Sequence, residues 1–286
     1  KLYYLISIMR LVLQEAEKVA ILITVASNLS EFNSDISFYF TNGGLRIHGT
    51  DSSHICLFDC FLENKWFNQY DTDNLKQPEN EEEDNSIKIT LTIDIFYKIL
   101  KMYKESQKLQ IEYEIDSDYL KVSLTDGVTS CDKYFDVPLL NTDDSINNLD
   151  MGESQVDLTM SSKKYTELIS QFELFNATIN FKLSEDKINL YTNSCNGNMN
   201  IELDISNIDL DEDVDEKLGL VGYAIDEDLV LQQIFSVRYM KLISKFDKLS
   251  NDIQLSFIQD RPVVVEYSIQ NSSYMKFYLA PRDDLE

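Results

Sequence analysis

The sequence is short of the residue types that most catalytic and metal sites need. Its 286 residues include two histidines, four cysteines and eight glycines. His48 and His54 stand near no serine or cysteine nucleophile motif, and neither a phosphate-binding loop nor a GxGxxG motif occurs. The cysteines, at positions 56, 60, 131 and 195, show no CxxC spacing. We therefore expect no enzyme activity, no bound metal and no cofactor.

Apolar runs long enough to cross a membrane are also missing. The opening stretch 1–14, KLYYLISIMRLVLQ, is apolar, but it is short and interrupted by Arg10. It lacks the small-residue cleavage site of a signal peptide. Unpaired cysteines are typical of a reducing compartment. These features predict a soluble, intracellular chain.

Positive charge is scarce, because 25 Lys and Arg face 50 Asp and Glu, a net charge of −25. Such a surface repels nucleic acid unless its cations cluster. Seven of the 25 do recur at helical spacing in two predicted helices: Lys98, Lys101, Lys104, Arg238, Lys241, Lys245 and Lys248. Each stripe could be an ordinary solvated helix face. Together they favour one surface reserved for phosphates, which would hold DNA without reading its sequence.

Hydrophobic periodicity predicts four helices among many short strands. The helices are expected at 15–30, after a cap at Asp94, after a cap at Ser161 or Ser162, and at 231–249. The strands are expected at 5–14, 36–39, 45–48, 55–62, 87–91, 109–115, 120–125, 130–137, 156–160, 178–183, 188–192, 199–205, 223–225, 253–258, 263–268 and 275–280. The order strand–helix–strands occurs twice in each half. This pattern predicts an α+β fold with antiparallel sheets and an internal repeat.

The middle of the chain breaks this pattern and divides it. We expect one domain at 1–138, a connecting loop at 139–153 and a second domain at 154–286. Acidic stretches at 71–86 and 209–217 are expected to be solvated loops. The connector carries four isolated apolar residues, Leu139, Leu140, Ile146 and Leu149. They either anchor the connector to the body or border a groove for partner peptides, and the sequence leaves both options open.

The C-terminal region contains the most distinctive sequence pattern of the chain. PVVVEY at 262–267 and KFYLAP at 276–281 alternate with period two around the polar turn 271–273, which predicts a hairpin. This hairpin resembles the end of the PCNA family of DNA sliding clamps. Further similar segments, in the right order through both halves, are GGLRIHGTDSSH at 43–54, KILK at 98–101, MNIELD at 199–204 and FSVRYMKLISKFDKLS at 235–250.

The resemblance implies a ring of three identical subunits, each of two similar domains with two helices packed on antiparallel sheets. Helices would line the hole and sheets would face outward. The implied partners are double-stranded DNA of any sequence, DNA polymerase and other proteins carrying a PCNA-interacting peptide, an ATP-driven clamp loader and further copies of the chain. The implied location is the nucleus, or a viral replication site if the source is a virus.

The resemblance also implies three sets of site residues. The DNA-binding set is Lys18, Lys98, Lys101, Lys104, Lys163, Lys164, Arg238, Lys241, Lys245 and Lys248. The partner-peptide pocket is His54, Leu57, Leu139, Leu140, Ile146, Leu149, Pro262, Tyr278, Leu279, Ala280 and Pro281. The subunit interface is Cys131, Lys133 and Tyr134 of one copy against Met199, Ile201 and Leu203 of the next.

The chain departs from the family pattern at several positions. Glu167 and Ser170 stand where arginines are expected, Thr50 replaces a methionine beside the pocket, and Glu185 occupies the position of the regulatory lysine. Three other functions stay open: a subunit of a heterotrimeric checkpoint-type clamp, a monomeric viral processivity subunit, and an acidic scaffold that never touches DNA.

Overall fold

The computed structural model describes residues 8–72, 86–127, 131–142, 151–194, 197–205 and 219–282. Every strand pair described in it is antiparallel, and four helices accompany the strands. The predicted α+β class with antiparallel sheets is therefore confirmed. The predictions at 73–85, 143–150 and 206–218, which include Ile146, Leu149 and most of the two acidic loops, lie outside the described residues.

The elements follow a fourfold repeat of strand, helix and three strands. The first is β1 (Ile8–Leu13), α1 (Ala16–Leu29), β2 (Asp35–Thr41), β3 (Gly44–Thr50) and β4 (Cys56–Glu63). The second is β6 (Ile87–Thr92), α2 (Ile93–Leu100), β7 (Lys108–Glu114), β8 (Tyr119–Thr125) and β9 (Lys133–Leu140). The third is β10 (Val156–Ser161), α3 (Ser162–Phe172), β11 (Thr178–Leu183), β12 (Lys187–Ser194) and β13 (Gly197–Asp204). The fourth is β15 (Leu231–Ser236), α4 (Val237–Ser244), β16 (Asp252–Phe257), β17 (Val263–Ser268) and β18 (Tyr274–Leu279).

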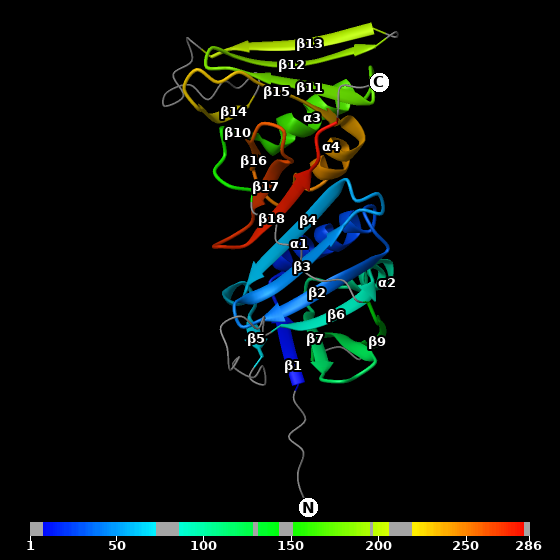
Figure 1. Cartoon of the computed structure of the whole chain (residues 1–286). Helices are drawn as coiled ribbons and strands as arrows, with labels where there is room; N and C mark the ends of the chain where they lie inside the picture. Colours follow the sequence, from blue (N-terminus) through cyan, green and yellow to red (C-terminus); the bar gives the residue numbers. More distant parts are fainter. Residues whose placement is uncertain are drawn as a thin grey trace, which may run out of the picture. The chain divides into compact units, whose positions relative to one another are not determined.

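Three short elements stand outside this repeat: η1 (Asn64–Trp66), β5 (Gln69–Asp71) and β14 (Leu220–Ile225). Register supports the equivalence of the two halves. Asp35 pairs with Thr92 directly before α2, and Thr178 pairs with Ser236 directly before α4. The internal repeat predicted from the sequence is thus present in the backbone (Figure 1).

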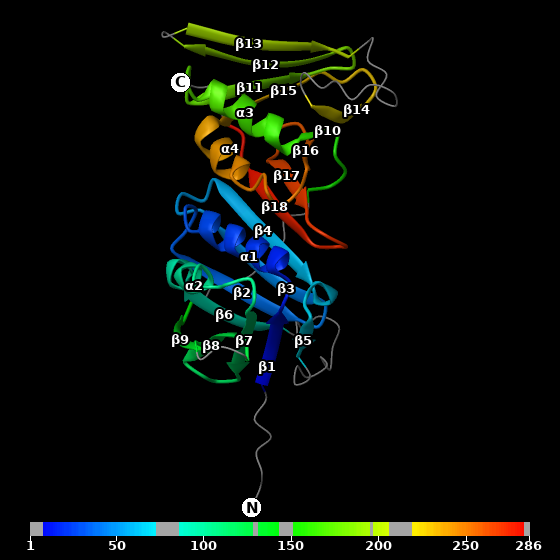
Figure 2. The same cartoon turned by 180° about the vertical axis from the view of Figure 1, so that it is seen from behind.

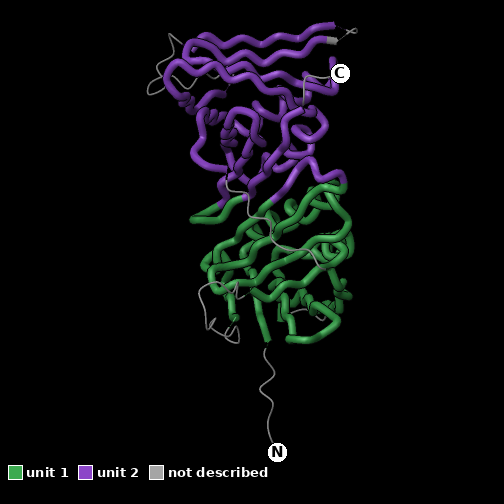
Figure 3. Tube along the Cα trace, viewed as in Figure 1, with its two compact units in different colours: residues 1–52, 59–146, 270–274 green, residues 53–58, 147–269, 275–286 purple. Residues whose placement is uncertain are grey.

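The chain forms two compact units (Figure 3). Unit 1 comprises residues 1–52, 59–146 and 270–274, and unit 2 comprises 53–58, 147–269 and 275–286. Each unit therefore contains two helices. The units interleave along the sequence, because part of β4 belongs to unit 2 and the tip of the β17–β18 hairpin belongs to unit 1.

Unit 1 places α1 and α2 side by side against its sheet, whose order is β3-β2-β6-β9-β8-β7-β1-β5 (Figure 2). Helix α1 forms although its sequence is rich in β-branched residues. Its apolar side chains Val19, Leu22, Val25, Ala26 and Leu29 recur at helical spacing and are all buried. Tertiary burial thus outweighs the weak helix propensity of these residues.

Unit 2 has two sheets, ordered β14-β10-β16-β17-β18 and β13-β12-β11-β15. Helices α3 and α4 pack on each other, with the Tyr165 hydroxyl 2.9 Å from the Met240 sulfur. The Tyr267 hydroxyl donates a 3.0 Å hydrogen bond to the Ile243 carbonyl and so ties β17 to α4. Phe181, Phe235 and Phe257 form an aromatic cluster in this core.

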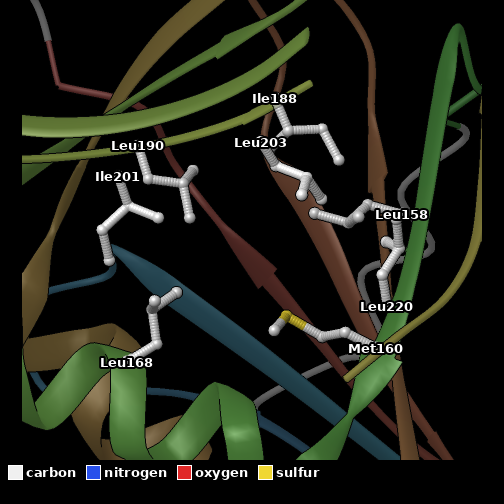
Figure 4. A pocket seen from close by; sticks show the side chains of 8 residues that line it. All are labelled: Leu158, Met160, Leu168, Ile188, Leu190, Ile201, Leu203 and Leu220. Carbon is white, nitrogen blue, oxygen red and sulfur yellow. The ribbon is translucent and has the colours of Figure 1, made fainter. Parts of the chain in front are cut away.

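A small apolar cavity of about 30 Å³ lies inside unit 2, behind β13 (Figure 4). Its lining residues are Leu158, Met160, Leu168, Ile188, Leu190, Ile201, Leu203 and Leu220. Such a volume is about that of one water molecule, far too little for an organic ligand. The cavity is therefore a local packing gap beneath the edge strand.

The last predicted helix, 231–249, is wrong in its first part. Residues 231–236 form β15, and α4 runs only from Val237 to Ser244. The sequence does not reveal this strand because Gln233, a polar residue, occupies an inward-facing position where the alternating pattern of a strand calls for an apolar one; it is 5% exposed. Its Nε2 donates hydrogen bonds of 3.1 Å to the carbonyls of Ile258 and Arg261, which compensates the burial of the amide nitrogen, whereas its Oε1 has no partner among the described residues.

Two smaller predictions also need correction. The N-cap of α2 is Thr92, and Asp94 lies in the first turn, where its charge still suits the helix dipole. Strand β9 continues through Pro138 to Leu140, so the predicted connector starts with strand residues. Pro138 is tolerated because β9 changes partner there, pairing with β8 up to Pro138 and with β6 at Leu139 and Leu140.

Candidate functional site

The basic residues of unit 1 differ in how freely their charges are presented. Lys98 is exposed on α2, and Lys101 is the exposed C-cap of that helix. Lys104 was predicted to lie on α2 but follows it in a turn, because the helix ends at Leu100. Lys18 on α1 is different, since its side chain is 14% exposed and its Nζ lies 2.9 Å from Glu15 Oε1.

The basic residues of unit 2 show the same division. Arg238 on α4 is exposed, whereas Lys245 is the helix C-cap and Lys248 lies in the following turn. The predicted stripe of four cations on one helix is thus a stripe of two, continued by a turn. Lys241 donates a 2.6 Å hydrogen bond to Ser170 Oγ and lies 3.4 Å from Glu173. On α3, Lys163 is exposed, and Lys164 lies 2.9 Å from Glu167.

Most of the predicted peptide-pocket residues belong to unit 2, and several main-chain contacts bring their elements together. The Ala280 amide donates to the Ile55 carbonyl at 3.1 Å, which joins the end of β18 to the segment before β4. The Arg282 amide donates to the Ile234 carbonyl of β15 at 2.8 Å. The turn before β17, which contains Pro262, is held by Gln233 as described above.

The side chains at this junction differ in exposure. His54 is exposed and has a left-handed backbone with φ 55°, while Pro262, Tyr278, Ala280 and Pro281 are half-buried. Leu57 and Leu279 are buried, at 8% and 0% exposure, and support the surface from below. Leu139 and Leu140 belong to β9 of unit 1. The pocket as a peptide-binding site stays a prediction.

Two strands offer unpaired edges where the subunit interface was predicted. In the described part of the chain, β13 pairs only with β12, at one end of its sheet. Residues 133–138 of β9 pair with β8 along one edge, and no strand of the described residues pairs with them along the other. Tyr134 on β9 is 73% exposed and Cys131 is exposed. Ile201 and Leu203 point into the cavity of unit 2 (Figure 4), while Asn200, Glu202 and Asp204, which alternate with them on β13, are exposed.

A buried charge cluster in unit 1 was not predicted. Asp59 on β4 is 2% exposed and accepts hydrogen bonds from Arg46 at 2.6 and 2.9 Å and from the Tyr274 hydroxyl at 3.2 Å. Burial alone would raise the pKa of Asp59, but His48 beside it and the bonds and charge of Arg46 lower that pKa overall. His48 Nδ1 lies 3.9 Å from Asp59 Oδ1 and has no hydrogen-bond partner among the residues that the structure describes. Alternation of Arg46 with the buried Leu45 and Ile47 places its side chain on the opposite face of β3, so the sequence pattern provided no signal for this ion pair.

Comparison with known proteins agrees with this architecture. Residues 149–282 match the family model described as proliferating cell nuclear antigen, C-terminal domain. The proliferating cell nuclear antigen of Chaetomium thermophilum is 22% identical over 268 residues, covering 93% of this chain and 96% of the relative. DNA polymerase sliding clamp 3 of Sulfurisphaera tokodaii is 27% identical over 256 residues, covering 89% and 92%.

The duplicated strand–helix–strands repeat, with two helices per unit and antiparallel sheets, defines a clamp-fold protein. The matches then specify which clamp. The family model over residues 149–282 and both relatives over most of the chain support a PCNA-type sliding clamp. Among the helices that the structure describes, none has both the length and the apolar content to cross a membrane.

Proposed function

We propose that this chain is a DNA sliding clamp, a processivity factor that encircles duplex DNA and tethers replication and repair proteins without catalysing a reaction itself. The observation that carries the proposal is the duplicated unit with cations on both of its helix pairs, in a chain of net charge −25. A surface of this kind attracts phosphates at one place and repels them elsewhere. The contacts are sequence-independent, which allows sliding.

Ring closure follows from the two unpaired edges. Strand β9 of one copy would pair with β13 of the next, so that a closed ring of three leaves neither edge exposed. Three copies of the 33.2 kDa chain have a mass of about 100 kDa. Light scattering after size exclusion measures this mass directly, and a monomer would contradict the ring of identical subunits.

Tyr134 provides a specific test of the interface. Its side chain is 73% exposed in the single chain, so Tyr134→Ala should leave the unfolding midpoint of the monomer nearly unchanged. Aromatic residues dominate interface energies, and truncating one at an interface costs about 2 kcal/mol or more, roughly 30-fold in affinity per contact. The protein concentration at which the trimer dissociates should therefore rise by roughly 30-fold or more. Tyr119→Ala, on the neighbouring strand β8 and 50% exposed, is the matched control and should leave the trimer intact.

Partner proteins would dock at the junction of unit 2 that contains Pro262, Tyr278 and Pro281. Its half-buried apolar surface suits an apolar peptide anchor, which gains about 1.5–3 kcal/mol for each side chain fully buried. Tyr278→Ala should abolish stimulation of a cognate DNA polymerase while leaving the trimer mass unchanged. Retained stimulation would place the partner site elsewhere. We further propose a nuclear or viral replication-site location and a dedicated clamp loader.

A further inference from the structure

Equivalent lysines on α1 and α3 are each neutralised by a neighbouring glutamate. Lys18 and Lys164 are both the third residue of their helix, and each precedes a buried residue, Val19 or Tyr165. Each Nζ lies 2.9 Å from a carboxylate of its own segment, Glu15 for Lys18 and Glu167 for Lys164. The bond from Lys18 also lowers the pKa of Glu15, so this carboxylate stays charged. A lysine–glutamate ion pair at the third residue of a helix thus occurs in both units.

The ammonium group of a third helix lysine, Lys241, also contacts neighbouring side chains. Lys241 of α4 reaches across to α3, where Ser170 Oγ accepts its hydrogen bond at 2.6 Å. Glu173, just beyond the end of α3, lies 3.4 Å from the same Nζ. A phosphate approaching Lys241 would have to replace both partners.

The cations at the C-terminal ends of α2 and α4 are arranged differently. Lys101 and Lys245 are the C-caps of these equivalent helices, and Lys104 and Lys248 follow each cap by three residues. Lys101, Lys104 and Lys248 are exposed, and no carboxylate of the described residues lies within 4.0 Å of them. The partial negative charge of a helix C-terminus favours lysines there, and Lys101 Nζ also lies 5.9 Å from the centroid of the Tyr97 ring.

Lysines with a carboxylate partner and lysines without one should differ in how much counterion release accompanies their contact with DNA. A lysine in open solvent can neutralise a phosphate and release cations condensed on the DNA, and each such contact contributes about 0.9 to the slope of log K against log salt. A lysine that already has a carboxylate partner at 2.9 Å contributes less, because phosphate binding must first break that ion pair. The two groups therefore differ in a measurable quantity.

We propose that Glu15, Glu167 and Glu173 are built-in competitors of DNA phosphates, which leave the grip on DNA to the exposed cations that have no carboxylate partner among the described residues. This inference rests on the proposed function. These cations include Lys98, Lys163 and Arg238 on the helices, and Lys101, Lys104 and Lys248 at and after the C-terminal ends of α2 and α4. The glutamates keep the grip weak, which suits a protein that must slide.

The test is the salt dependence of binding to a linear duplex, measured by fluorescence anisotropy with the full-length protein. The triple variant Glu15→Gln, Glu167→Gln and Glu173→Gln should steepen the slope by at least about 0.9, one added phosphate contact. The charge-matched control removes three exposed carboxylates away from the helices: Glu153→Gln, Asp186→Asn and Glu227→Gln. An equal rise in both variants would show a general charge effect and overturn the proposal, as would an unchanged slope in the first.

A second arm removes two of the cations that the proposal makes responsible. Lys101→Ala with Lys248→Ala should lower the slope, whereas Lys65→Ala with Lys182→Ala, an equal loss of charge on η1 and β11, away from α1 to α4, should not. Equal slopes in the two double variants would overturn the inference while leaving the clamp function intact. A wild-type chain without any DNA binding would instead refute the proposed function itself. Circular dichroism of each variant confirms that the fold is retained.

Discussion

Replacing Asp59 by asparagine should destabilise unit 1 by about 2–3 kcal/mol at neutral pH. Removing one partner from a fully buried ion pair costs about 3–5 kcal/mol. The value here is lower because the Arg46 side chain is 26% exposed and can recover part of its hydration. With a urea dependence of about 2 kcal/mol per molar, the unfolding midpoint should fall by about 1 M. Tryptophan fluorescence reports this transition, because Trp66 lies buried in unit 1.

The pH dependence of the difference in unfolding free energy between wild type and Asp59→Asn gives the sharper test. The pKa of Asp59 in the folded chain is below its usual 3.8, so its contribution is fully present above about pH 4. It is lost as pH falls through the folded-state pKa, since the unfolded chain then binds the proton more readily. The gap between wild type and Asp59→Asn should therefore close below about pH 4.

A control separates the charge pair from ordinary hydrogen bonding. Asp157 on β10 accepts hydrogen bonds from Ser154 and Ser256, and has no cation partner among the described residues. Asp157→Asn should cost less than about 1 kcal/mol. The ion-pair account would be refuted if Asp59→Asn cost no more unfolding free energy than Asp157→Asn. It would also be refuted if the difference between wild type and Asp59→Asn were the same at pH 3 as at neutral pH.

Three further predictions concern substitution or modification of single residues. Gly44→Ala should cost more than about 2 kcal/mol in unfolding free energy, because a Cβ there would lie 2.2 Å from the Leu62 carbonyl oxygen. Gly43→Ala should be tolerated, because the nearest atom to its Cβ would be 3.7 Å away, and equal urea midpoints for the two variants would contradict this. Maleimide should modify the exposed Cys131 before the buried thiols of β4, and the adduct should lower the trimer fraction; a modified chain that still runs at trimer mass would remove this residue from the interface. Tyr267→Phe should cost about 1–2 kcal/mol through the lost bond to a main-chain carbonyl of α4, and an unchanged midpoint would show that water replaces the hydroxyl.

Much of the backbone could be predicted from periodicity because most strands and helices bury one consistent face. The strand at 178–183 was predicted with its observed bounds, and α1 falls within one residue of the predicted 15–30. The failure at 231–236 came from a single inward-facing glutamine, which breaks the alternation that marks a strand. Burial of Gln233 depends on carbonyls far along the chain, and no local pattern reveals such partners.

The candidate site was predictable in composition but not in its electrostatics. Helical spacing of cations does not tell where a helix ends, so Lys104 and Lys248 were placed on helices that stop before them. The pairing of Lys241 with Glu173 crosses from one helix to another, which sequence spacing cannot show. The Asp59–Arg46 pair joins two strands in the same way. The DNA-binding, peptide-pocket and interface residues as sets remain predictions.

The most direct test of the clamp account is retention on circular DNA. The protein is loaded onto a nicked circular plasmid, and the bound fraction is measured by gel filtration before and after a single restriction cut. A closed ring held by topology stays on the circle at about 0.2 M salt, where weak phosphate contacts alone fail, and slides off once the ends are free. Equal loss from circular and linear DNA would contradict encirclement.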